Sequence, residues 1–100
     1  MKMHKPPHPG EFIEEVYLEE HDVTRADLAR ALNVSPSSVA RLIASKAAVS
    51  PAMAIKLEKA LGVSAGSWLA MQSAYDLWHA SRDKALLRGV STLKLDDRAA

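Results

Sequence analysis

The sequence predicts an all-α fold with five helices, and three observations support this prediction. Apolar residues recur at the i, i+3 and i+4 spacing of a buried helix face in five separate segments. Serine, threonine or proline stands at the start of each segment, where these residues favour the first positions of a helix. Strand-like alternation is weak and confined to residues 91–95. The chain of 100 residues is long enough for one domain with its own core.

The first helix is expected to run from about residue 9 to residue 20. Pro9 suits its first position, and Glu11 lies in the first turn, next to the positive end of the helix dipole. The second helix begins at Thr24, and Asp27 three residues later completes a short-armed capping box. The apolar faces of these two helices comprise Phe12, Ile13, Val16 and Tyr17, and Leu28, Ala29 and Leu32.

A nearly repeated motif marks the ends of two helices, as ALNVS at residues 31–35 and as ALGVS at residues 60–64. In the second copy, Gly62 suits the left-handed conformation that commonly follows a helix. Asparagine tolerates that conformation better than most residues, so Asn33 is expected to end its helix in the same way. The valine that follows in each copy is placed to pack back against the helix.

Ser35 caps a third helix, and Pro36 takes its first position because the residue before a proline is pushed out of helical geometry. We expect this helix to end near residue 44 and a fourth to span residues 51–61. The residues expected to face inward from these two helices are Val39, Leu42 and Ile43, and Ala54, Leu57 and Leu61.

A fifth helix begins at Ser64 or Ser67 and carries a stripe that includes three aromatic residues. We assign Trp68, Tyr75 and Trp78 of this stripe to core and dimer packing. A polar run then interrupts the pattern, and continuation of the helix to Gly89 stays open. The predicted organisation is a flexible N-terminal arm at residues 1–7, one domain at residues 8–80 and a C-terminal extension at residues 81–100.

The net charge of +1 conceals an uneven distribution along the chain. Residues 1–22 carry two basic and six acidic side chains, which gives −4, whereas residues 23–62 carry six basic and two acidic side chains, which gives +4. A basic middle segment is what a face for polyanions requires. Solvated helix faces explain the same charges about equally well, so charge alone does not select a function.

The second and third helices are joined by a tight turn, and this arrangement predicts a helix-turn-helix motif. In such a motif the second helix lies in the DNA major groove and presents its first turn to base edges. Ser37 and Ser38 are short and polar, and their hydroxyls both donate and accept hydrogen bonds. Arg41, one turn later, reaches a guanine or a phosphate. The alternative is that both serines are ordinary exposed residues at a helix start.

The segment VTRADLARALNVSPSSVARLIASK resembles the repressor-like helix-turn-helix of phage repressors and xenobiotic-response-element regulators. The flanking segments narrow the resemblance. HPGEFIEEVYLEE before it, and VSPAMAIKLEKALGVSAGSWLAMQSAYDLW after it, are similar to HigA-type antitoxins, whose members open with a comparable HPGE segment and close with a WLxxQxAYDLW-like helix. The resemblance covers residues 8–78, and the two end motifs are its most specific part.

This resemblance implies a homodimer of five-helix subunits that represses its operon through a palindromic operator DNA. It also implies a HigB- or RelE-like toxin as partner, a ribosome-dependent messenger-RNA endonuclease. Ser45 and Ala47 depart from the family pattern, which often has glycine and arginine there, so one charge that would neutralise the DNA backbone is absent. Carried over by position, the base contacts fall on Pro36, Ser37 and Arg41, and the phosphate contacts on Arg25, Ser35, Ser38 and Lys46.

Other chemistry finds little support in the sequence. The absence of cysteine excludes disulfides and thiol catalysis. His4 and His8 lie in a proline-broken segment, so no metal site is expected. Neither a nucleophile–base pair nor a glycine-rich phosphate loop is apparent, and we therefore expect no enzyme, no catalytic residue and no cofactor. Without a signal peptide or a long apolar run, we expect a cytoplasmic protein with no membrane partner.

Two alternative functions stay open at this point. The first is a stand-alone transcriptional regulator without a toxin. The second is an interaction module that inhibits a partner enzyme and has lost DNA binding, which the modest net charge and the neutral residue at position 47 favour.

Overall fold

The computed structural model describes residues 4–95 and consists of helices joined by short turns, with no strand in that part of the chain. The first helix begins as α1 and continues directly into a π-helical segment, η1. Taken as one, these two segments give the expected total of five helices. The elements are α1 (Pro9–Ile13), η1 (Glu14–Glu19), α2 (Arg25–Leu32), α3 (Pro36–Ile43), α4 (Pro51–Leu61) and α5 (Ala65–Ser81).

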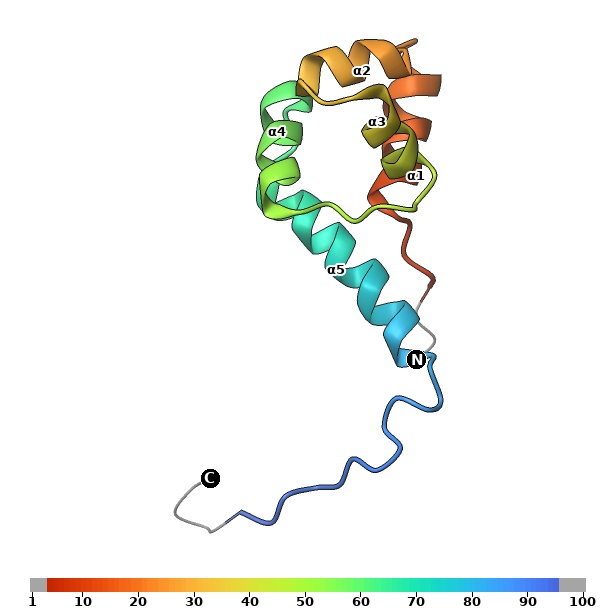
Figure 1. The fold of residues 1–100 in the computed structure, drawn as a ribbon, viewed down its shortest axis with the longest axis vertical. Helices are drawn as coiled ribbons and strands as arrows, with labels where there is room; N and C mark the ends of the chain where they lie inside the picture. The colour runs from red at the N-terminus through yellow and green to blue at the C-terminus, as the bar shows by residue number, and fades with distance from the viewer. Residues whose placement is uncertain (1–3, 96–100) are drawn as a thin grey trace.

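Figure 1 shows how these helices are arranged. Helix α2 crosses one end of the group, α4 lies on one side, and α1 and α3 lie together on the other. Helix α5 packs against α4 and α1 and then runs away from the group, with the N-terminal segment near its far end. Within residues 4–95, no helix is both long enough and apolar enough to cross a bilayer.

Local capping sets the starts of the helices where the sequence predicts them. The Thr24 hydroxyl accepts the Asp27 N–H at 2.9 Å, and Asp27 Oδ2 accepts the Thr24 N–H at 3.1 Å, which completes the capping box. The bond that the Asp27 carboxylate accepts from the Thr24 backbone N–H is the main cause that lowers the pKa of Asp27, because it favours the charged form. The predicted cap Ser35 is confirmed, since it accepts an N–H group of its own first turn, and Ser50 and Ser64 do the same for α4 and α5.

The two copies of the repeated motif end their helices as expected. Asn33 has φ 55° and ψ 49°, and Gly62 has φ 88°. The Val34 N–H donates to the Ala29 carbonyl at 3.0 Å, which closes the end of α2. Val34 and Val63 then pack, partly buried, against the core.

The core confirms the predicted inward faces with one exception. The segment η1 buries no residue, and Val16, predicted to face inward, is not among the residues packed against the core, whereas Phe12 and Tyr17 are. Trp68 is fully buried at 0% exposure, so it belongs to the core of the chain and has no surface left for dimer packing. Tyr75 and Trp78 are only half-buried. The buried apolar residues are Ile13, Leu28, Ala29, Leu32, Val39, Leu42, Ile43, Val49, Ala54, Leu57 and Trp68.

The structure settles the question left open at the end of the fifth helix. Helix α5 ends at Ser81, and the next residues form separate turns instead of a further helix. Asp83 accepts the Leu86 N–H through its carbonyl and the Ala85 N–H through Oδ1, so its carboxylate competes with helical bonding. The π-helical geometry of η1 was not expected. After its end, the Val23 N–H donates back to the Tyr17 carbonyl at 3.2 Å.

Candidate nucleic-acid interface

Helices α2 and α3 pack against each other across a tight turn, and α3 divides into two faces. Its buried face consists of Val39, Leu42 and Ile43. The opposite face is exposed and carries Ser37, Ser38 and Arg41 at the spacing that places side chains on one side of a helix. Pro36 is exposed at the first helical position. The predicted outward orientation of this helix is therefore confirmed.

The serines at the start of α3 form a linked hydroxyl cluster. Ser35 Oγ lies 3.1 Å from Ser37 Oγ and 2.9 Å from Ser38 Oγ, and it accepts the Ser38 N–H at 3.2 Å. The first turn of α3 contains no acidic residue, so the positive end of the helix dipole is not neutralised there. This end of the helix is chemically suited to a phosphate group.

The basic residues near α3 differ in whether a carboxylate holds them. Arg25 Nη2 lies 3.6 Å from Glu14 Oε1 on η1, and both side chains are largely exposed, so this pair contributes at most about 1 kcal/mol. Among residues 4–95, no carboxylate pairs with Arg41 or Lys46. Arg25 would have to leave Glu14 to reach a phosphate, whereas Arg41 and Lys46 are available without such a change.

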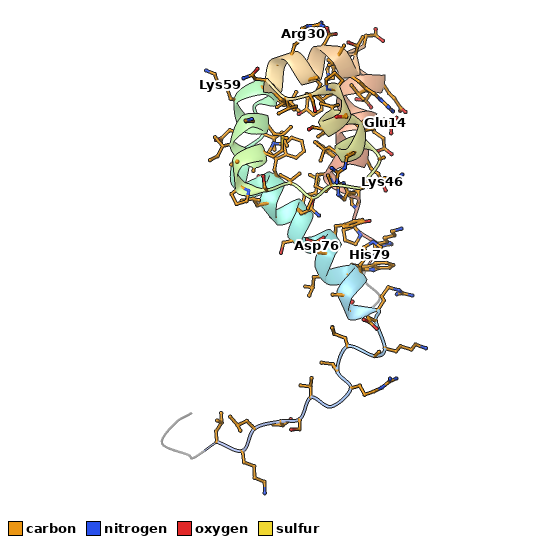
Figure 2. The ribbon with its side chains drawn as sticks, in the orientation of Figure 1. Glu14, Arg30, Lys46, Lys59, Asp76 and His79 are labelled. Carbon is orange, nitrogen blue, oxygen red and sulfur yellow. The ribbon has the colours of Figure 1, made fainter. Side chains whose placement is uncertain are left out.

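Lys46 is positioned by its own backbone at the end of α3. Its N–H donates to the Arg41 carbonyl at 2.8 Å, and Ser45, between them, has φ 61°. This is the left-handed conformation for which a glycine is favoured, and serine adopts it here at some cost. In Figure 2 Lys46 lies beside α1 and α3, while Lys59 lies on the opposite side, at α4.

The HPGE motif has a structural role that the sequence analysis missed. His8 is 2% exposed and caps α1, because its Nδ1 accepts the Gly10 N–H at 2.9 Å. Its ring contacts Tyr75 of α5 edge-on, with the centroids 4.8 Å apart. A Cβ at Gly10 would lie 1.9 Å from the Leu42 carbonyl oxygen, so only glycine lets the start of α1 pack against the end of α3.

The glutamine of the C-terminal motif was also missed. Gln72 of α5 is 6% exposed, and its Oε1 accepts the Val49 N–H at 2.9 Å. Its Nε2 donates to Asp76 Oδ1 at 3.0 Å. The two motifs that carried the specific family resemblance, HPGE and WLxxQxAYDLW, thus surround the end of α3 and the loop that follows it. That these two motifs are specific to one family was the only sequence signal for a role of His8, Gly10 and Gln72.

Acidification is expected to destabilise the protein through His8. Burial is the main cause that lowers the pKa of His8 below its usual value of 6.5, although the Asp76 and Glu11 carboxylates oppose this. The neutral ring is also the form whose Nδ1 accepts the Gly10 N–H. The contribution of His8 to stability is therefore complete above the pKa that this histidine has in the unfolded chain. It is lost as the pH falls below that value toward the lower pKa of His8 in the folded protein.

Thermal unfolding between about pH 7.5 and 5.5, around the usual histidine pKa, measures this effect. His8→Asn is the matched variant, because asparagine is a good helix cap that does not titrate in this range. We expect the unfolding temperature of the wild type to fall more on acidification than that of His8→Asn. Equal pH dependence of the two proteins would show that His8 is not responsible.

Two short helices at a tight crossing, with the first turn of the second one exposed, polar and free of acids, define a helix-turn-helix DNA-binding protein. Comparison with known proteins agrees, since the sequence model described as helix-turn-helix matches residues 15–68. The regulator YddM of Escherichia coli strain K12, an HTH-type transcriptional regulator, is 42% identical over 94 residues, covering 92% of this chain and 99% of that protein.

The other similar proteins include antitoxins. Antitoxin HigA-1 of Vibrio cholerae is 38% identical over 74 residues, covering 74% of this chain and 70% of that protein. The structure of Pseudomonas aeruginosa antitoxin HigA with the higBA promoter matches with a TM-score of 0.79 and 34% identity, covering 90% of this chain and 99% of that one. The chain belongs to the helix-turn-helix family, among the HigA-type antitoxins and related regulators.

Proposed function

We propose that this protein is the cytoplasmic antitoxin of a type II toxin–antitoxin pair, which represses its own operon as a dimer and neutralises a HigB- or RelE-like toxin. The observation that carries the proposal is the outward face of α3. Ser37 and Arg41 are exposed on that face, and no carboxylate within residues 4–95 pairs with Arg41. Residues 8–80 form the unit that acts on DNA.

In the proposed complex α3 enters the major groove of the operator. Ser37 and Arg41 contact base edges from its first two turns, and Pro36 lies against the same bases. Two copies read half-sites about 34–36 Å apart, and the half-buried Tyr75 and Trp78 contribute to the contact between them. The DNA backbone is held by the residues assigned to phosphate, Arg25, Ser35, Ser38 and Lys46.

A related antitoxin supports the DNA-binding half of this proposal. The similar Pseudomonas aeruginosa HigA structure was solved with its promoter. The toxin half rests on charge as well as on relatives named as antitoxins. The acids Glu11, Glu15 and Glu19 are exposed along α1 and η1, where they complement the positive charge expected of a protein that cleaves RNA.

Two measurements test the proposal. The first is binding of the wild-type protein to its own promoter at several salt concentrations, where affinity should fall steeply as salt rises. The second is co-expression with the product of the adjacent small open reading frame. Expressed alone, that product should inhibit growth; expressed together with this protein, it should be neutralised and the two should co-purify. A protein that neither binds its promoter nor rescues growth is not an antitoxin of this kind.

The stand-alone regulator is the second candidate, because YddM, the relative with 42% identity, is described as a transcriptional regulator. Promoter binding without any effect on the neighbouring product would select it. Growth rescue without salt-dependent DNA binding would instead select the interaction module that has lost DNA affinity.

Lys46→Ala is expected to weaken binding to all DNA sequences equally, because a phosphate contact carries no base information. The slope of log K against log salt concentration should decrease in magnitude by about one. Fluorescence anisotropy with operator and scrambled duplexes provides both quantities. Lys59→Ala removes the same charge from the opposite side of the molecule and should leave the slope unchanged. An unaltered slope in Lys46→Ala would remove Lys46 from the phosphate contacts.

A further inference from the structure

We propose that Gln72 is a positioning residue for DNA binding, which holds the loop at residues 44–50 so that Lys46 meets a phosphate. The inference rests on the proposed function, because it takes Lys46 as a contact to the DNA backbone. It adds Gln72, a residue of α5 remote in sequence from the helix-turn-helix motif, to the residues that determine the affinity for DNA.

The hydrogen bond from Val49 to Gln72 is unlike the others in the structure. It joins residues 23 positions apart, whereas every other side-chain hydrogen bond among residues 4–95 joins residues at most four apart, except the bond of the His8 ring to the Ala47 backbone. Both ends of this bond are buried, with Val49 at 4% and Gln72 at 6% exposure. It is therefore the one polar side-chain tie between α5 and the loop after α3 within these residues.

The chemistry of the two neighbours selects an amide at position 72. The Val49 N–H needs an acceptor and the Asp76 carboxylate needs a donor, and Gln72 provides Oε1 for the first and Nε2 for the second. This requirement also fixes the orientation of the amide. Asp76 is exposed and bonds the Nε2 group, so it holds the glutamine side chain in place from the solvent side.

The loop that carries Lys46 is held at both ends. At its start the Lys46 N–H donates to the Arg41 carbonyl, and at its end the Val49 N–H donates to Gln72. Loss of the Gln72 acceptor would leave a buried N–H without a partner, and the loop would have to move for this group to reach water. Lys46 lies at the first anchor, three residues before the released end, so its side chain would shift with the loop, while Ser37 and Arg41 on α3 would keep their places.

The decisive variant is Gln72→Met, which keeps the length of the side chain and removes both polar atoms. We expect operator and scrambled DNA to bind more weakly by the same factor, about fivefold at about 0.15 M salt, with the salt slope lower in magnitude by about one. In a Lys46→Ala background, Gln72→Met should cause no further change in slope. A merely structural loss would lower the unfolding temperature without this matched change in slope.

Exchange of the amide at position 72 and the carboxylate at position 76 provides a rescue test, because it returns a matched hydrogen-bond pair without changing the net charge. Gln72→Glu places a second carboxylate against Asp76 and should weaken DNA binding as Gln72→Met does. The carboxylate at position 72 can still accept the Val49 N–H, but its repulsion from Asp76 displaces it. Adding Asp76→Asn removes the repulsion, gives the pair at positions 72 and 76 a donor and an acceptor again, and restores the original net charge. The double variant should recover the wild-type slope, and this comparison replaces Gln72→Met if that variant does not fold.

Separate outcomes refute the inference and the proposed function. Wild-type protein that fails to bind its promoter refutes the proposed function, and the inference with it. Wild-type protein that binds, together with a folded Gln72→Met of unchanged affinity and slope, refutes the inference alone. Failure of the Asp76→Asn swap to recover any of the loss in Gln72→Glu also overturns it.

Discussion

Gly10→Ala is expected to destabilise the fold by at least about 3 kcal/mol. The added Cβ would lie 1.9 Å from the Leu42 carbonyl oxygen and 2.8 Å from the Leu42 carbonyl carbon. Both atoms belong to the backbone of α3, so no side-chain rotation relieves the clash. The start of α1 would have to separate from α3, and the buried His8 cap would move with it.

Gly66→Ala is the matched control for this change. Gly66 lies in the first turn of α5, and a Cβ there would meet nothing within 4 Å. Alanine favours a helix over glycine, so this variant should be unchanged or more stable by up to about 1 kcal/mol. Urea unfolding of both variants gives the two free energies. Similar urea midpoints for Gly10→Ala and Gly66→Ala would show that α1 and α3 leave room for a Cβ at position 10, and would contradict the close contact of Gly10 with Leu42.

The double variant Ser37→Ala and Arg41→Ala is expected to bind the operator about a hundredfold more weakly. A bidentate contact from arginine to a base contributes about 1–3 kcal/mol, and a serine hydroxyl adds a smaller amount. Both side chains are exposed, so the free energy of unfolding should change by no more than about 0.5 kcal/mol. Binding to scrambled DNA should fall much less, because base contacts carry the specificity.

A gel-shift titration with operator and scrambled duplexes, combined with thermal unfolding, measures these effects. Lys59→Ala again provides the control, since it removes one positive charge away from α3. Operator binding by the double variant equal to that of the wild type would contradict the assignment of α3 to the major groove. A loss that is equal for both duplexes would reassign Arg41 from a base to a phosphate.

The prediction of the interface from sequence succeeded where it depended on periodicity. The spacing of Val39, Leu42 and Ile43 determines which side of α3 is buried, and the exposed positions of Ser37 and Arg41 follow from it. The sequence could not show that Arg25 is paired with Glu14, because the two residues lie on different helices.

By itself, the sequence determined where α1, α2, α3 and α4 begin and where α2 and α4 end. A cap, a proline at a first helical position or an asparagine at a helix end acts on residues within one turn, so its effect can be predicted from neighbours alone. Thr24, Ser35 and Asn33 act in this way, and each does in the structure what its local context predicts.

Only the tertiary structure decided what joins the two ends of the domain to each other, to α3 and to the loop that follows it. His8 against Tyr75, Gly10 against Leu42 and Gln72 bonded to Val49 are contacts between residues far apart in the chain. Such contacts depend on how the helices cross, and neither periodicity nor spacing encodes the crossing. His8, which the sequence offered only as an unsuitable metal ligand, is therefore a buried cap in the folded protein, and Gly10, in the first turn of α1, is the point where two helices touch.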